Sequence, residues 1–187
     1  MVDRRIVPLA LATLLAVAVS GCDFGSTTSD EPMAIGGRAT AAGFVLEVRL
    51  PSQTFAAVDA IPVATTLTWT GAPGQGRIWG SGSGPVTFAL EEVGGDRRTM
   101  GGAMTADCAV REFPAGIPTE IPFRKSGAWT GEDPNADFYA AWFKDPLLHL
   151  PAGRWKLTVS VGGYLAPCAQ GARTIEAAVG PFEILVR

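Results

Sequence analysis

Histidine occurs only once in this 187-residue sequence, as His149, and cysteine only three times. A zinc site needs three or four protein ligands, and one histidine with two cysteines that we expect to pair cannot supply them. A Ser-His-Asp hydrolase needs a nucleophile for its histidine, but no Gly-x-Ser-x-Gly motif occurs, and the serines of residues 80–84 stand in the wrong phase. These shortages predict a protein without enzymatic activity and without a cofactor.

Positive charge is also scarce, because Lys and Arg total 15 against 18 Asp and Glu, for a net charge of −3. Nucleic-acid binding depends on a basic surface that displaces counterions from phosphates, so we expect no nucleic-acid partner. Glu91 and Glu92 are adjacent in an expected strand and therefore point to opposite faces. They cannot form the facing pair of carboxylates that glycoside hydrolysis needs.

The N-terminal apolar run is too short to cross a bilayer. It covers residues 6–19, behind Arg4 and Arg5, and as a helix it measures about 21 Å against a hydrocarbon core of about 30 Å. A short apolar run behind a basic start is typical of a signal peptide. We therefore expect this segment to direct export.

The run ends in Val19-Ser20-Gly21-Cys22, which resembles the lipobox of bacterial lipoproteins. The resemblance implies that residues 1–21 are a signal peptide, that Cys22 carries lipid, and that the protein is held at the extracytoplasmic face of the bacterial cell membrane. Residues 22–43 have no apolar periodicity, so we expect a flexible tether between the anchor and the folded domain.

Residues 44–187 show the alternation of apolar side chains that is typical of strands with one buried face. Turns rich in glycine and proline separate these strands, which favours an all-β fold, an immunoglobulin-like antiparallel β-sandwich. The expected strands cover residues 44–50, 61–69, 77–80, 86–90, 104–110, 120–123, 155–161 and 182–186.

One short helix is expected over residues 134–144, where apolar residues recur at helical spacing and Asp133 can cap the first turn. Asp133, Asn135 and Asp137 also have the alternate spacing that opens a calcium loop. The glycine and glutamate that such a loop needs are replaced by Phe138 and Lys144, so calcium is the weaker interpretation. The helix is expected to bury Phe138, Ala141 and Trp142.

Cys108 and Cys168 remain once Cys22 is assigned to the lipid, and we expect them to form a disulfide in an oxidising compartment. Cys108 alternates with Met104, Ala106 and Val110, which predicts an inward-facing position. A redox or metal pair would need closer spacing and more ligands.

The order of Cys108, a tryptophan (Trp129 or Trp155) and Cys168 is similar to the Cys-Trp-Cys order of immunoglobulin domains. The stretch from Asp133 to Trp155 also resembles uncharacterised bacterial lipoproteins with a C-terminal sandwich of this kind. That resemblance implies the fold and the localisation, and it carries no known chemistry.

Five tryptophans occur in the chain, and Trp79 and Trp129 are the candidates for contact with a ligand. Tryptophan on the surface of a β-sandwich can stack on sugar rings, whereas buried tryptophan packs the core. We expect a non-enzymatic binding domain on a lipid anchor, with an envelope protein or a glycan as its partner. The alternative is a carbohydrate-binding or protease-inhibitor-like module.

Overall fold

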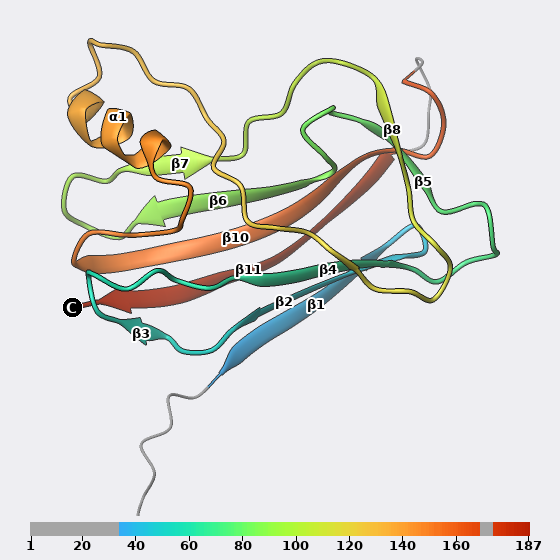
Figure 1. Ribbon diagram of the computed structural model, residues 1–187, viewed down its shortest axis with the longest axis horizontal. Helices are drawn as coiled ribbons and strands as arrows, with labels where there is room; N and C mark the ends of the chain where they lie inside the picture. The colour runs from blue at the N-terminus through green and yellow to red at the C-terminus, as the bar shows by residue number, and fades with distance from the viewer. Residues whose placement is uncertain (1–33, 169–173) are drawn as a thin grey trace, which may run out of the picture. The chain divides into compact units, whose positions relative to one another are not determined.

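The computed structural model describes residues 34–168 and 174–187, so the expected signal peptide and Cys22 lie outside the described residues. The described chain forms two β-sheets with one short helix (Figure 1), which confirms the expected all-β sandwich. Its elements are β1 Ile35–Ala41, β2 Phe44–Leu50, β3 Thr54–Phe55, β4 Ala64–Trp69, β5 Arg77–Gly80, β6 Val86–Glu92, β7 Thr99–Gly101, β8 Ala109–Glu112, β9 Thr119–Glu120, α1 Ala136–Lys144, β10 Gly153–Tyr164 and β11 Thr174–Val186.

The first sheet has the strand order β1-β2-β4-β9. Strand β2 has the predicted bounds, and Phe44, Leu46 and Val48 face the core with 0% exposure. The predicted tether over residues 22–43 is wrong for residues 35–41, because these form β1 and pair with β2 along their whole length. Small residues explain the error: a Cβ on Gly37 would lie 2.5 Å from Val179, so glycine allows β1 to pack closely on β11.

The second sheet is built on the long antiparallel pair β10 and β11, with the short β3 parallel to the far edge of β11. On its other side β10 pairs with β6 over residues 155–161 and then, at Tyr164, with β5. Strand β7 extends the sheet beyond β6, and β8 extends it beyond β5. The chain between β7 and β8 therefore has to cross from one branch of this sheet to the other.

The core lies between the two sheets, where the inward residues of both are almost fully buried. Trp155 and Leu157 of β10 are 0% exposed, as is Leu67 of β4. Trp142, which was expected in the core together with Trp155, is 5% exposed. The alternation that predicted the strands thus corresponds to real burial on one face of each sheet.

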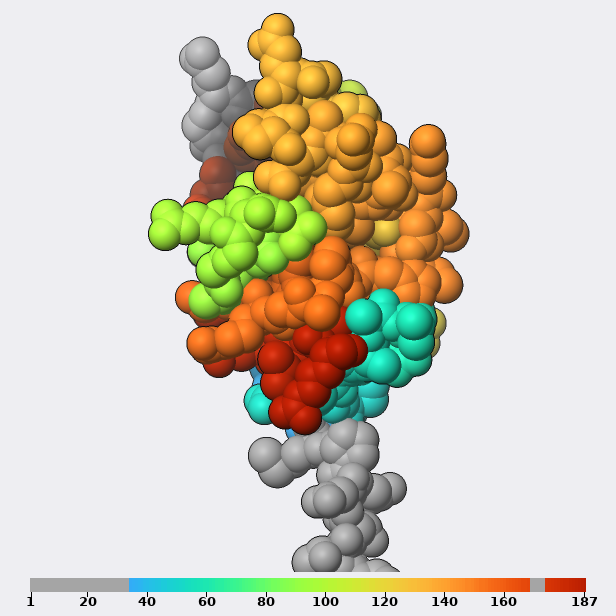
Figure 2. Space-filling view, turned by 90° about the vertical axis from the view of Figure 1, so that its left-hand side faces the viewer, coloured from blue at the N-terminus to red at the C-terminus, as the bar shows by residue number. Residues whose placement is uncertain are grey.

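Helix α1 begins two residues later than predicted, and of its three expected inward residues Trp142 is buried, Phe138 is half-buried and Ala141 is exposed. The Asp133 carboxylate accepts a hydrogen bond from the Asn135 backbone N–H (2.8 Å), so it closes the turn before the helix instead of capping it. Tyr139 and Trp142 are buried, whereas Ala141 is exposed. Figure 2 looks at this end of the domain, with the green turn between β6 and β7 lying between the red C-terminal strand and the amber segment that contains α1.

The disulfide between Cys108 and Cys168 is confirmed, with 5.8 Å between the Cα atoms. Its predicted inward position is wrong, because both cysteines are exposed and the strand begins only at Ala109. Gly101 and Gly102 have positive φ (94° and 76°) and turn the chain onto the outer face of the sheet before Cys108 is reached. The disulfide joins two parts of one sheet, whereas the disulfide of an immunoglobulin domain crosses between sheets.

Candidate functional site

A groove runs along the outer face of the second sheet, and we call it the outer groove. Its floor consists of successive outward positions of β6 and β10, with Thr87 opposite Ser160 and Ala89 opposite Thr158. Gly162 follows on β10, and a Cβ there would meet nothing within 4 Å. The floor is low because none of these five side chains is larger than threonine.

The wall of the outer groove is the segment 101–107, which runs from β7 towards β8. Two adjoining hollows of about 700 and 500 Å³ lie between this wall and the floor. Gly101, Gly102 and Ala103 line the first hollow, and Met104 to Asp107 line the second. Neighbouring floor positions also divide between the hollows, so the two hollows lie end to end along the sheet.

Polar contacts hold the wall in place, although most of its residues are exposed. The buried Ser81 hydroxyl accepts a hydrogen bond from the Thr105 backbone N–H (3.0 Å). The Asp107 carboxylate accepts from the Gly82 backbone N–H (2.9 Å) and from the Thr105 hydroxyl, and the Thr105 contact is the main cause that lowers the pKa of Asp107. The disulfide starts at the next residue, so the wall is tied at both of its ends.

Aromatic side chains flank the second hollow of the outer groove. Tyr164 of β10 stands opposite Trp79 of β5, and Trp79 stands opposite Val110 of β8. Paired residues on adjacent strands share a face, and Ile78 points inward with 1% exposure, so all three residues point outward. Tyr164 is 37% exposed and Val110 is 48% exposed, and together they form an accessible apolar row.

The other end of the outer groove lies beside α1. Glu91 and Lys156 stand opposite each other on the floor, and Tyr139 and Phe143 of α1 contribute to the first hollow. The Tyr139 hydroxyl donates to the Thr99 carbonyl (3.2 Å), which attaches α1 to β7. The groove is thus closed by the helix at one end and flanked by aromatic residues at the other.

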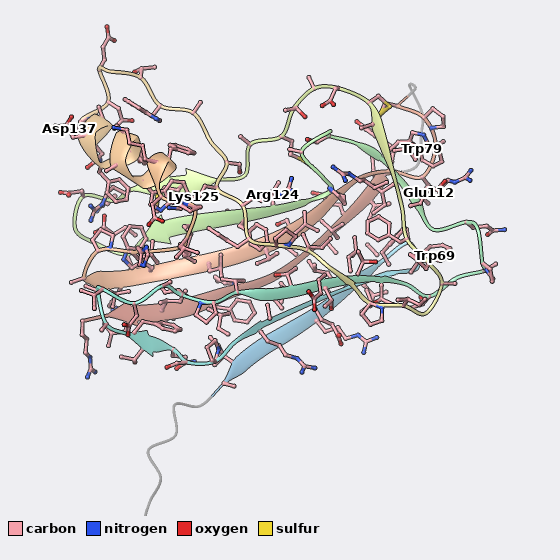
Figure 3. All side chains as sticks on the ribbon, in the orientation of Figure 1. Trp69, Trp79, Glu112, Arg124, Lys125 and Asp137 are labelled. Carbon is pink, nitrogen blue, oxygen red and sulfur yellow. A yellow bond between two sulfur atoms is a disulfide. The ribbon has the colours of Figure 1, made fainter. Side chains whose placement is uncertain are left out.

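The two tryptophans predicted as ligand contacts do not lie together. Trp79 is half-buried beside the outer groove, at the end of the domain opposite Asp137 of α1 (Figure 3). Trp129 is 38% exposed in the segment before α1, next to Ala128 of the first hollow. Only Trp79 belongs to a row of outward-facing apolar residues, so it remains the stronger of the two candidates.

The predicted calcium residues Asp133, Asn135 and Asp137 lie at the start of α1. In residues 34–168 and 174–187, no group of three or more His, Cys, Asp and Glu side chains is arranged to hold a metal ion. The Asp133 carboxylate is already engaged in the turn with Asn135. The geometry therefore favours the structural interpretation of these residues.

His149 forms a pair with Asp145, at 2.5 Å between Nδ1 and Oδ2, and this hydrogen bond is the main cause that lowers the pKa of Asp145. Asp145 also lies 3.9 Å from the Lys125 ammonium, which donates to the Trp142 carbonyl (2.7 Å). Burial lowers the pKa of Lys125. Within the described chain the hydrogen-bond partner of His149 is this carboxylate and not a serine, so the cluster holds the segment after α1 in place.

Trp79 was predicted from the sequence as a ligand contact, but the floor and the wall of the outer groove were not predicted. Outward Thr, Ser, Ala and Gly are ordinary on the solvent face of a strand. The sequence of one strand alone therefore does not predict a groove. The available signal was that β10 alternates Thr158, Ser160 and Gly162 with buried residues, without a long side chain among them. Recognising the groove needs the pairing of β6 with β10, which are far apart in the sequence.

Comparisons with known proteins give no family for this chain, since no protein-family model, no curated protein and no solved structure matches it. Among the residues that the structure describes, no helix is long and apolar enough to span a membrane.

Proposed function

We propose that this protein is an exported, lipid-anchored binding protein without enzymatic activity, and that it holds its partner in the outer groove. The anchor part rests on the sequence: a basic start, a short apolar run and the lipobox-like residues before Cys22. The lipid on Cys22 would hold the domain at the extracytoplasmic face of the cell membrane, where a disulfide is stable.

The observation that carries the binding proposal is the contrast between the outer faces of the two sheets. The outer face of the first sheet carries long charged side chains, including Arg49 and the ion pair of Arg38 with Glu47 (3.5 Å). The outer groove has instead a floor of short side chains, a fixed wall and exposed apolar residues at one end. A concave surface with few charges is the usual form of a ligand site.

Photo-crosslinking on intact cells tests the binding proposal. A photoreactive amino acid at Met104, which is 42% exposed on the wall, is expected to capture an envelope component. The same amino acid at Arg49, exposed on the other sheet, serves as the control and is expected to capture much less. Equal capture from both positions, or none from Met104, would contradict a partner in the groove.

The anchor is tested separately with Cys22→Ala and metabolic labelling by an alkyne fatty acid. The natural chain is expected to carry the label and to sediment with membranes, and the variant is expected to do neither. An unlabelled natural chain that retains Met1 would refute the lipoprotein assignment while leaving the groove unaffected.

A further inference from the structure

We infer that the outer groove takes an uncharged polysaccharide strand, with Trp79 and Tyr164 as the platform for a sugar ring and the hydroxyls of the floor as polar contacts. This inference rests on the proposed function and names the chemical class of the partner.

The aromatic platform is the first argument. Sugar rings present C–H groups on their faces, and these groups pack on aromatic rings while the sugar hydroxyls remain at the edges. Trp79 and Tyr164 are register partners on adjacent strands, both outward, and Tyr164 is 37% exposed. Tyr164 also lines the second hollow of the outer groove, so a ring placed on the platform continues directly into the groove.

The polar character of the groove is the second argument. Thr87 and Ser160 face each other on the floor, and Thr158 follows towards α1. Hydroxyl groups donate and accept hydrogen bonds, as sugar hydroxyls do, so each can serve either role towards a sugar.

The charges along the outer groove argue against a polyanionic polymer. Glu91 and Lys156, at the α1 end, stand opposite each other and offset one another. The carboxylate of Asp107 is occupied by its hydrogen bonds within the wall. Glu176 of β11, which is exposed opposite Gly162, adds another negative charge to the second hollow, so the acidic residues that line the groove outnumber the basic ones and a polyanion would be repelled.

The geometry distinguishes a polysaccharide from a peptide strand. From Lys156 to Tyr164 the floor extends about 26 Å along β10, which accommodates several sugar rings in a row. Peptides that add to a sheet pair with a free strand edge, but this floor is the face of β10 between β6 and β11, where both edges are already paired. A ligand on such a face contacts side chains and not the backbone of a free strand edge. Sugars can bind in this way, whereas an added peptide strand needs the backbone.

Filling the floor at Gly162 is the sharpest test. A Cβ at this position meets nothing within 4 Å, and the backbone N–H keeps its bond to the Pro85 carbonyl (2.8 Å). Gly162→Leu is therefore expected to fold normally and to place an isobutyl group in the groove. Gly131→Leu is the matched control, because a Cβ at Gly131 also meets nothing within 4 Å, outside both hollows.

The assay is isothermal titration of the full chain in detergent with neutral oligosaccharides: β-1,4-glucan, β-1,3-glucan, α-1,4-glucan and chitin fragments. At least one is expected to bind. Gly162→Leu and Trp79→Ala are each expected to weaken that binding by at least tenfold, and Gly131→Leu is expected to leave it within twofold. Equal melting temperatures of the two leucine variants establish that any loss is local.

The outcomes separate the two proposals. If no oligosaccharide binds, and crosslinking from Met104 captures a protein, the polysaccharide is refuted and the binding function stands. If neither experiment captures a partner, both are refuted. If an oligosaccharide binds equally to Gly162→Leu, it occupies another place, and the outer groove is refuted as its site.

Discussion

The most informative perturbation is the removal of Arg98, which supports the end of the outer groove next to α1. Arg98 precedes β7 and forms a bidentate pair with Glu92, at 2.8 Å from Nε and 2.7 Å from Nη2. The guanidinium also lies 4.6 Å from the ring centre of Phe138 on the segment of α1. One side chain therefore connects β6, β7 and the helix.

The expected loss of unfolding free energy follows from the burial of the pair of Arg98 with Glu92. The side chains of Glu92 and Arg98 are 6% and 12% exposed, and removing one partner of a buried pair costs about 3–5 kcal/mol because the other charge is left uncompensated. We expect Arg98→Met to lower the unfolding free energy by about 3 kcal/mol, at the low end of this range because some water reaches the pair. The lost contact with Phe138 adds up to about 1 kcal/mol. For a domain of this size the melting temperature falls by about 10 °C.

The assay is a double-mutant cycle of Arg98→Met with Glu92→Gln, measured by urea unfolding at neutral pH. We expect a coupling of about 2 kcal/mol, because Glu92→Gln removes the buried charge that makes the loss of Arg98 costly. The cycle has its own control, since each variant is compared with the double variant that lacks both charges. Additive effects of the two single variants on the unfolding free energy would show that Glu92 and Arg98 do not act as a buried charge pair.

The pH dependence gives a second check on the same pair. The hydrogen bonds from Arg98 are the main cause that holds the pKa of Glu92 below its ordinary value. The folded pKa is thus below the unfolded one, so the contribution is present above about pH 4.5 and is lost as the pH falls through the folded pKa. The difference in stability between the natural chain and Arg98→Met is expected to shrink with acidification, and a constant difference would contradict the assignment.

Two further predictions concern the interior and the disulfide. Thr65 is 3% exposed and its hydroxyl has no hydrogen-bond partner among the described residues, so Thr65→Val is expected to raise the unfolding free energy by about 1 kcal/mol in urea titrations, and a loss of stability would contradict this. The disulfide closes a loop of 60 residues, and the double variant Cys108→Ser, Cys168→Ser is expected to lose about 4 kcal/mol in the chain-entropy model. A loss of unfolding free energy below about 1 kcal/mol in the same titration would contradict this, because it would mean that the disulfide hardly restricts the unfolded chain.

Two strands, β2 and β5, were predicted to the residue, whereas β6, β10 and β11 extend beyond their predicted bounds. β2 begins and ends as expected because four inward apolar side chains alternate with Val45, Glu47 and Arg49 before Pro51 ends the strand, and β5 likewise has its expected bounds. β1 was missed because its inward positions are occupied by Gly37, Ala39 and Ala41 besides Ile35, and these small residues have little hydrophobic signal. They are only half-buried, and the close approach of β11 at Gly37 is a tertiary effect that the sequence of β1 does not show.

The position of Cys108 shows a different limit. Alternation from Met104 to Val110 predicted an inward cysteine, but Met104 and Val110 are 42% and 48% exposed. Gly101 and Gly102 take positive φ angles that other residues adopt at a cost, and the chain leaves the sheet there. A period of two indicates buried strands only when a neighbouring strand exists to pair with, and the sequence does not reveal that neighbour.

The candidate site was not predicted, although most of the fold was, because the two depend on different properties of the strands. The core depends on each strand separately, since Phe88 and Leu90 of β6 and Leu157 of β10 are apolar whatever strand lies beside them. The outer groove depends on the pairing itself: Thr87 faces Ser160, and Ala89 faces Thr158, only in the register that joins β6 to β10. A shift of one residue would exchange these positions with Phe88 and Val159, which are 2% and 0% exposed. Burial of the core therefore fixes the register, and the register in turn brings the short side chains together as the floor of the groove.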